Sequence, residues 1–325
     1  MKAVNFLLLR TEGPGDINEA TLPESKLTVP VIQPQKLMAV VRRRMLQVLR
    51  MYRDSGADLK KFIDKARGLG FKKAEEHASS GWECTIQPPI ASSGEKSTDI
   101  GMDGYCPACT IFGTALTSDQ LSGISNMSLG IKTRVHFDPA FATNRMIVPE
   151  THNKASEGHL STTGGSLFSD VHVMPGTVFI GRMTLHDVTE PELLAVLYSL
   201  ITSEEIGGRS RVYGTIKIEL LGIRCGCYSA TTSLDLADYI AGKGLEKPSE
   251  ILGALREKLY KELGFTPITN REVLSLVNPA ETHEDSVLAK LWESSIEYTS
   301  QMVDWIKKLK GEEKPKSKSK SRSKK

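Results

Sequence analysis

Residues 35–53 read QKLMAVVRRRMLQVLRMYR, and the periodicity of this stretch anchors the fold prediction. Apolar side chains recur at helical spacing, namely Leu37, Val41, Met45, Val48 and Tyr52. This pattern predicts an amphipathic helix. The opposite face is basic, with Lys36, Arg43 and Arg50 seven residues apart. We therefore expect a helix that buries one side and presents positive charge on the other.

Working outward from this helix, short apolar or alternating runs predict strands. They cover residues 3–10, 129–137, 172–186 (two strands or one bent strand) and 211–223. Thr189 and Glu192 form a capping box ahead of a second apolar-faced helix. The order strand, helix, strand, strand, helix, strand is that of the ferredoxin-like fold. The predicted class is therefore α+β.

Large insertions are predicted to interrupt this core. We divide the chain into the first half of the core with the basic helix (1–54), an insertion (55–128), a core strand (129–137), a long polar loop (138–170), the second half of the core (171–248), a helical region (249–310) and a basic tail (311–325). The insertion at 55–128 has no sustained period, so we expect something other than a hydrophobic core to stabilise it. The Lys-Ser repeat of the tail predicts disorder.

Charge is distributed unevenly along the 325 residues, although the formal net charge is only +3. Residues 1–73 carry 15 basic and 7 acidic side chains, residues 74–310 carry 20 and 30, and the tail carries 7 and 2. This distribution implies separate basic and acidic surfaces. A coherent basic surface favours phosphate binding, and the tail can bind nucleic acid without reading its sequence.

The sequence also indicates the cellular compartment in which the protein is expected. No apolar run approaches the roughly 18 to 20 residues that span a membrane, and the run Ala3 to Leu9 leads to no cleavage site for a signal peptide. Five cysteines without an export signal favour the reducing cytoplasm, where thiols bind metal or stay free. We expect a cytoplasmic protein without disulfides and without a membrane partner.

Cys106-Pro107-Ala108-Cys109 is a C-x-x-C pair at the spacing of a zinc knuckle. Cys84 and His77 lie upstream in the same insertion and are ligands of the right kind. We predict a structural zinc site formed by His77, Cys84, Cys106 and Cys109. A redox pair and free thiols are the alternatives. The remaining cysteines, Cys225 and Cys227, are interpreted as small residues of a sheet.

Residues 204–214, EEIGGRSRVYG, join the end of the second predicted helix to a strand. A glycine that caps the helix explains one of the glycines. Gly207 and Gly208 also allow a phosphate backbone to approach the main chain, while Arg209 and Arg211 supply charge. The two interpretations are compatible.

Three stretches together resemble the RAMP superfamily of CRISPR-associated proteins: CPACTIFGTAL at 106–116, IKTRVHFDPAF at 131–141 and IGGRSRVYG at 206–214. Within it, the chain most resembles the Csc-two family, the Cas-seven-type backbone subunits of type I-D interference complexes. The resemblance covers the body of the chain and excludes the tail.

The resemblance implies an RRM-like core enlarged by zinc-binding, lid or thumb, and helical insertions. It also implies copies that self-associate along a guide RNA (crRNA), contact other CRISPR effector subunits, and bind RNA, or alternatively single-stranded DNA, without reading bases. Such binding uses phosphates and sugars. The implied contacts are Arg209 and Arg211 beside Gly207 and Gly208, Arg145 and Met146 in the thumb loop, and secondarily Lys132, Arg134, Arg43 and Arg50.

The chain departs from an ordinary RRM, because it has no R-G-F-G-F-V-type strand and Tyr213 is the only aromatic near the equivalent position. Stacking on paired sheet aromatics is therefore not expected.

A nuclease is the alternative function. Backbone subunits of type III complexes, which the chain also resembles, cut target RNA with a loop aspartate after the first strand, and Asp16 is the candidate here. Cleavage would need a metal ion, whereas a turn residue is the simpler interpretation of Asp16. We expect a non-catalytic RNA-binding subunit; a zinc scaffold that binds only protein is a third class.

Overall fold

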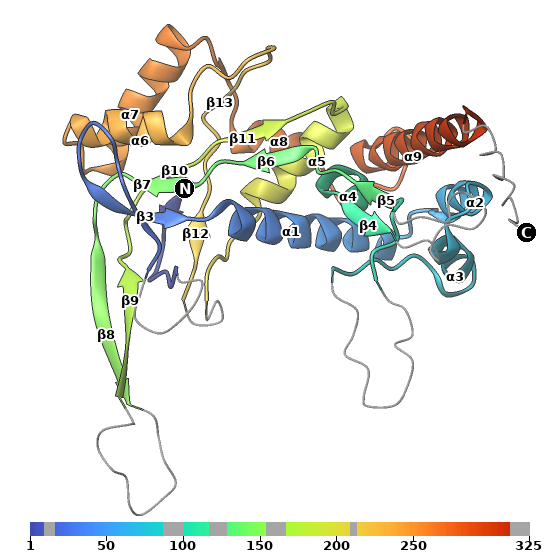
Figure 1. Cartoon of the computed structure of the whole chain (residues 1–325), viewed down its shortest axis with the longest axis horizontal. Helices are drawn as coiled ribbons and strands as arrows, with labels where there is room; N and C mark the ends of the chain where they lie inside the picture. The colour runs from blue at the N-terminus through green and yellow to red at the C-terminus, as the bar shows by residue number, and fades with distance from the viewer. Residues whose placement is uncertain (10–16, 87–100, 117–128, 154–166, 209–212, 313–325) are drawn as a thin grey trace, which may run out of the picture.

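The computed structural model describes residues 1–9, 17–86, 101–116, 129–153, 167–208 and 213–312. Asp16, Arg209, Arg211 and residues 313–325 of the tail lie outside these residues, whereas the first two residues of the predicted tail, 311 and 312, end a helix. The chain folds into a mixture of helices and short strands (Figure 1). Across the described part, none of the helices has the length and hydrophobicity to cross a bilayer.

Helix α1, Pro34–Asp54, runs through the middle of the molecule (Figure 1). The predicted apolar face is confirmed, since Leu37, Val41 and Tyr52 are buried. Proline suits the first helical turn because its φ is already helical and its missing N–H needs no partner there. Leu37 belongs to one hydrophobic cluster and the later apolar residues belong to another, so α1 joins the two cores.

The first core surrounds the C-terminal part of α1. It is built by α2 (Lys60–Gly68), α3 (Lys72–Ser80), α4 (Pro107–Phe112), α5 (Glu190–Ile201) and α9 (Val287–Glu312). Trp82 and Trp292 are buried at its centre, edge to face with ring centroids 5.1 Å apart. The expectation that the 55–128 insertion lacks a hydrophobic core is therefore wrong, because α2, α3 and α4 share a core with α1 and α9.

The second core lies at the N-terminal end of α1. A four-stranded sheet of order β10-β7-β3-β2 packs with helices there. Its strands are β2 (Glu19–Thr21), β3 (Thr28–Ile32), β7 (Ala140–Ala142) and β10 (Phe179–Ile180). The helices are α6 (Ser233–Gly242), which the sequence did not predict, and α7 (Pro248–Glu257), which continues as a π-helical turn, Lys258–Glu262.

The N-terminal segment lies between two others. Strand β1 (Lys2–Ala3) pairs with β12 (Ile216–Lys217), and Lys2 also bridges Val178. Further along, Leu7 bridges Val173 and Leu8 bridges Gly208, all antiparallel. The predicted first strand is thus one short strand followed by isolated bridges.

The remaining strands form two-stranded pairs. These are β4 (Thr114–Leu116) with β5 (Leu129–Ile131), β6 (Val135–Phe137) with β11 (Met183–Leu185), and β13 (Gly222–Ile223) with β14 (Thr266–Pro267). The prediction of a single strand over 129–137 is wrong, because β5 pairs with β4 whereas β6 pairs with β11.

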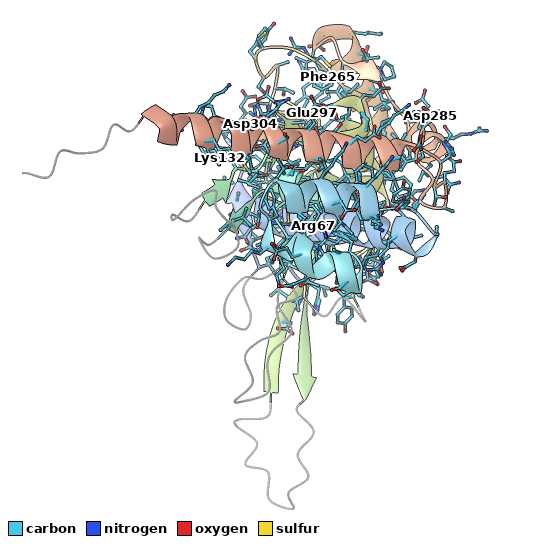
Figure 2. All side chains as sticks on the ribbon, turned by 90° about the vertical axis from the view of Figure 1, so that its right-hand side faces the viewer. Arg67, Lys132, Phe265, Asp285, Glu297 and Asp304 are labelled. Atoms are coloured by element: carbon cyan, nitrogen blue, oxygen red, sulfur yellow. The ribbon has the colours of Figure 1, made fainter. Side chains whose placement is uncertain are left out.

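Strands β8 (Ile147–Asn153) and β9 (Leu167–Val173) form an antiparallel hairpin that projects from the body (Figures 1 and 2). The segment predicted as a loop at 138–170 therefore contains β7 and β8 and the beginning of β9. The capping box of α5 is confirmed. The helical C-terminal region is confirmed by α7, α8 (Asn270–Leu276) and α9.

Candidate metal centre and nucleic-acid interface

Three cysteines and one aspartate form a buried cluster. One ligand atom from each of Cys84, Asp103, Cys106 and Cys109 lies within 4.8 Å of the others, and the three cysteines are free thiols. Cys106 occupies the N-cap position of α4 and Cys109 lies in its first turn, whereas Cys84 follows α3. The Sγ atoms of Cys84 and Cys109 are 3.7 Å apart. Two thiolates at about 2.3 Å from one tetrahedral zinc would be about 3.8 Å apart, so the cluster fits that ion.

Asp103 is the member that sequence reasoning missed. Its Oδ1 accepts hydrogen bonds from the backbone N–H groups of Tyr105 (3.1 Å) and Cys106 (3.0 Å), and its Oδ2 accepts from Trp82 Nε1 (2.7 Å). The carboxylate therefore fixes the start of the C-x-x-C turn and offers an oxygen to the ligand set. An aspartate three residues before Cys106 was the available signal, since Asp commonly bonds backbone N–H groups just after it.

The electrostatics of the cluster favour a cation. Hydrogen bonds from the Cys106 and Cys84 thiols lower the pKa of Cys109, whereas burial raises the pKa of Cys106. Burial, together with the nearby Cys109 charge, raises the pKa of Asp103 to about 8. Desolvated anionic groups this close together repel each other, and a bound metal ion removes that penalty.

His77, the predicted fourth ligand, is not in the cluster. Its Nδ1 makes a short hydrogen bond with the Tyr105 hydroxyl, and burial lowers its pKa. Tyr105 packs in turn against Phe71 and Trp292. The structure thus brings together three of the four predicted ligands, replaces His77 by Asp103, and gives His77 a place in packing α3 beside the cluster. Cys225 and Cys227 are exposed and separate from it. They lie after β13 and outside the strands, so their interpretation as small residues of a sheet is wrong.

Arginines of α1 hold the segment that contains Cys84. Arg50 donates to Cys84 O (2.7 Å) and Glu83 Oε1 (2.9 Å). Arg53 donates to Trp82 O (2.8 Å) and Glu83 Oε2 (2.6 Å). Arg50, predicted to contact RNA, therefore clamps a cysteine ligand's main chain. Arg43 on the same helix is exposed.

Arg134, a second predicted RNA contact, is 8% exposed. Its guanidinium pairs with both carboxylate oxygens of Glu192 (2.6 and 3.0 Å) and lies over the Tyr298 ring. Its Nε donates to Thr110 O on α4. Arg134 thus joins α4, α5 and α9, and its side chain does not face solvent.

The other predicted contacts lie nearer the surface. Lys132 is exposed and lies at the outer edge of the body (Figure 2). Arg145 is exposed and pairs with Glu19 (2.8 Å), and Met146 is half-buried at the base of the β8–β9 hairpin.

Gly207 and Gly208 lie against the N-terminal segment. Gly208 N donates to Leu8 O (3.0 Å), and a Cβ on Gly207 would lie 2.6 Å from the same oxygen. Gly207 and Gly214 have φ of +95° and +92°, which favour glycine. A Cβ on Gly214 would lie 2.4 Å from Ile206 O. These glycines let residues 207–208 and residue 214 close against the main chain, which is a sufficient structural reason for them.

A family model and a solved structure both match this chain over nearly its whole length. The family model described as Csc2 Crispr matches residues 1–323. The crystal structure of Thermofilum pendens Csc2 is 52% identical, covers 95% of this chain and 88% of its own, and superposes with a TM-score of 0.76. No curated protein matches.

Two chains of CRISPR RNA-guided surveillance complexes match more weakly. One, described as pre-nicking, has 12% identity, coverage of 94% and 98%, and a TM-score of 0.42. The other has 9% identity, coverage of 91% and 96%, and a TM-score of 0.37. Both TM-scores are too low to establish a shared fold.

Proposed function

The chain belongs to the Csc2 CRISPR family, and on that premise we propose that it is a non-catalytic backbone subunit of a type I-D CRISPR interference complex, which binds guide RNA without reading its sequence. The family match over residues 1–323 carries the proposal. The described residues add support from the fold, the surface charge and the metal cluster.

The strand pairings support a ferredoxin-like, RRM-like core. Residues 1–9 lie between the 206–217 segment and the 173–178 segment, with antiparallel bridges on both sides. Helices α1 and α5 connect the strands in the order that this fold requires. The β8–β9 hairpin and β12 both lie at the N-terminal end of α1 (Figure 1), and we assign the RNA path to this end.

Charge supports contacts with phosphates. Arg43, Lys132 and Arg145 are exposed and come from three different segments of the chain, namely α1, the connection after β5 and the connection before β8. The Arg145–Glu19 pair is exposed, and such pairs contribute little to stability, so Arg145 can exchange its carboxylate for a phosphate at small cost. Arg145, together with Arg209 and Arg211, which lie outside the described residues, forms the main proposed sequence-independent contacts. Arg43, on α1, and Lys132, next to Ile131 of the first core, are secondary contacts.

We assign structural zinc to Cys84, Cys106 and Cys109, with Asp103 as the oxygen donor. Thiolates in a tetrahedral arrangement favour zinc. When bound, the ion cross-links the segment after α3 to the start of α4. The residues themselves set the geometry: Asp103 orients the turn and Arg50 holds the main chain of Cys84.

Two measurements test the proposal. Sequencing of nucleic acid that co-purifies from the native host should return short RNAs with a shared repeat-derived handle. Purified protein should bind unrelated single-stranded RNAs with similar, salt-sensitive affinity, and matched single-stranded DNA serves for comparison. A marked sequence preference, or no affinity for RNA, would contradict RNA binding. Regular metal-dependent cuts that disappear in Asp16→Ala would instead favour the nuclease.

Metal analysis tests the zinc assignment independently. Protein purified without chelators should contain about one zinc per chain, which is the occupancy of a single closed site. Absence of zinc in such protein would refute this part of the proposal without affecting the test of RNA binding.

A further inference from the structure

Three aromatic rings from three separate segments gather beside the N-terminal segment. The ring centroids of Phe6 and His172 are 6.1 Å apart, those of Phe6 and Tyr213 are 6.3 Å apart, and those of His172 and Tyr213 are 4.9 Å apart. The sequence showed only Tyr213 at this position, because Phe6 and His172 are distant in the chain. Pairing of distant segments therefore places two further rings beside Tyr213, although Phe6 and Tyr213 themselves lie outside the strands.

The backbone fixes the side of the chain on which these rings lie. Leu7 and Val173 exchange backbone hydrogen bonds of 3.0 and 2.9 Å, and their side chains are buried in the second core. Neighbouring side chains along an extended segment point to opposite sides. Phe6 and His172 therefore lie on the other side from the core, while Gly214 N donates to Phe6 O (2.7 Å) and brings Tyr213 beside them.

Core packing does not account for this group. Among the described residues, Phe6 and Tyr213 belong to neither hydrophobic cluster. His172 is fully buried, whereas Phe6 and Tyr213 are partly exposed. The group therefore has a buried base and a partly accessible aromatic surface.

The location connects the rings to the proposed RNA contacts. Tyr213 directly precedes Gly214, at the end of the 206–214 segment that contains Gly207 and Gly208. Phe6 lies two residues before Leu8, whose carbonyl accepts from Gly208. His172 lies on β9, opposite Val148 of β8, near the base of the hairpin. The rings thus lie between two parts of the chain that we assign to RNA.

The geometry points to a nucleobase-stacking site formed by Phe6 and Tyr213, with His172 as its buried support; this inference rests on the proposed binding of guide RNA. The Phe6 and Tyr213 rings are inclined at 87°, so a base on the face of one ring meets the edge of the other, a favourable aromatic arrangement. Every base has a π face, so stacking adds affinity without selecting sequence. That property suits a subunit whose guides differ.

The experiment compares a mixed-sequence single-stranded RNA with an abasic sugar–phosphate strand of the same length and charge. The unmodified protein should bind the base-containing strand more tightly by roughly 5- to 150-fold, the range expected from loss of one stacked base. The double variant Phe6→Leu/Tyr213→Leu should lose most of this preference while keeping its salt dependence. Tyr213→Phe, which keeps the ring, should retain the preference.

Tyr228→Leu is the matched control, because Tyr228 is 71% exposed and packs on Arg224. This variant should keep the preference of the unmodified protein for the base-containing strand. If the double variant does not fold, the single variants and the unmodified protein still give the comparison. Salt-sensitive RNA binding with equal affinity for both strands would overturn the stacking site alone. Absence of RNA binding would instead contradict the proposed function, and the stacking site with it.

Discussion

Two segments form their sites from different kinds of group. We call residues 84–109, which contain the proposed zinc ligands, the metal-bearing segment, and residues 206–214 the glycine segment. In residues 84–109, side chains form the site: three thiols and a carboxylate converge in a buried space. In the described part of residues 206–214, main-chain groups set the geometry, because Gly208 N donates to Leu8 O and Gly207 leaves no room for a Cβ. A site formed by side chains can be recognised in a sequence from its residue types. A site formed by main-chain groups is indicated only by residues small enough to permit the close contact.

This difference predicts different responses to substitution. A change in the metal-bearing segment should remove a cofactor and a cross-link together. A change in the glycine segment should deform the backbone and leave the metal in place. The variants below test that separation.

The largest effect is expected from Cys109→Ser, which removes a ligand from the buried cluster. Zinc content should fall from about one per chain to near zero. Structural zinc contributes on the order of 10 kcal/mol in small zinc-binding peptides, so thermal unfolding should shift to much lower temperature. Metal analysis and circular-dichroism melting measure both effects.

Cys225→Ser is the control for this prediction, because Cys225 is an exposed thiol outside the cluster. It should leave zinc content and melting temperature unchanged. Full zinc retention in Cys109→Ser would show that the cluster is not the metal site.

Arg134→Met should give the next largest effect. It leaves the buried Glu192 carboxylate without its bidentate partner and removes a donor to Thr110 O on α4. Breaking a buried pair in this way costs about 3 to 5 kcal/mol, measurable by urea denaturation. The double variant Arg134→Met/Glu192→Gln removes the buried charge but keeps an acceptor for Thr189 N in the capping box of α5, so it should recover part of the loss. If the single variant retains full stability while RNA affinity falls, Arg134 is an RNA contact after all.

Gly207→Ala tests the glycine segment. The positive φ alone costs about 1 to 2 kcal/mol for a residue with a Cβ, and the Cβ would also lie 2.6 Å from Leu8 O. We expect reduced stability and RNA affinity with zinc content unchanged. Gly253→Ala is the control: Gly253 lies inside α7, and a Cβ there would enter open space, so the change should stabilise by up to about 1 kcal/mol. Zinc loss in Gly207→Ala would show that the two segments are coupled.

Much of the fold followed from local pattern, and the failures have physical causes. The spacing of apolar residues in α1 and the capping box of α5 are local signals, and both elements formed as expected. The prediction that the 55–128 insertion lacks a hydrophobic core was wrong because α2 and α3 are short helices whose burial depends on α9, more than 200 residues away in the sequence. Tertiary packing, which the sequence pattern does not contain, supplies their stability.

The candidate sites show the same limit. Cys106 and Cys109 were predictable because their spacing is set by one turn. His77 and Asp103 are both near in sequence, and only the folded backbone shows that Asp103 reaches the cluster while His77 turns to Tyr105. For Phe6 and His172, pairing of distant segments brings the rings to Tyr213.

The smallest effect is expected for Arg43 and Arg50, two arginines on one face of α1 that were both predicted from the sequence to contact RNA. Arg43 is exposed, so Arg43→Ala should leave stability and zinc unchanged, and should weaken RNA binding by about 1 kcal/mol with a salt slope shallower by about 1. Arg50→Ala removes donors to Cys84 O and Glu83, and charged hydrogen bonds of this kind contribute about 1.5 to 3 kcal/mol. It should lower the melting temperature and speed zinc loss to a chelator. If both variants instead weaken only RNA binding, the helix is uniformly an RNA surface, and the separation between metal-bearing and RNA-facing parts of α1 does not hold.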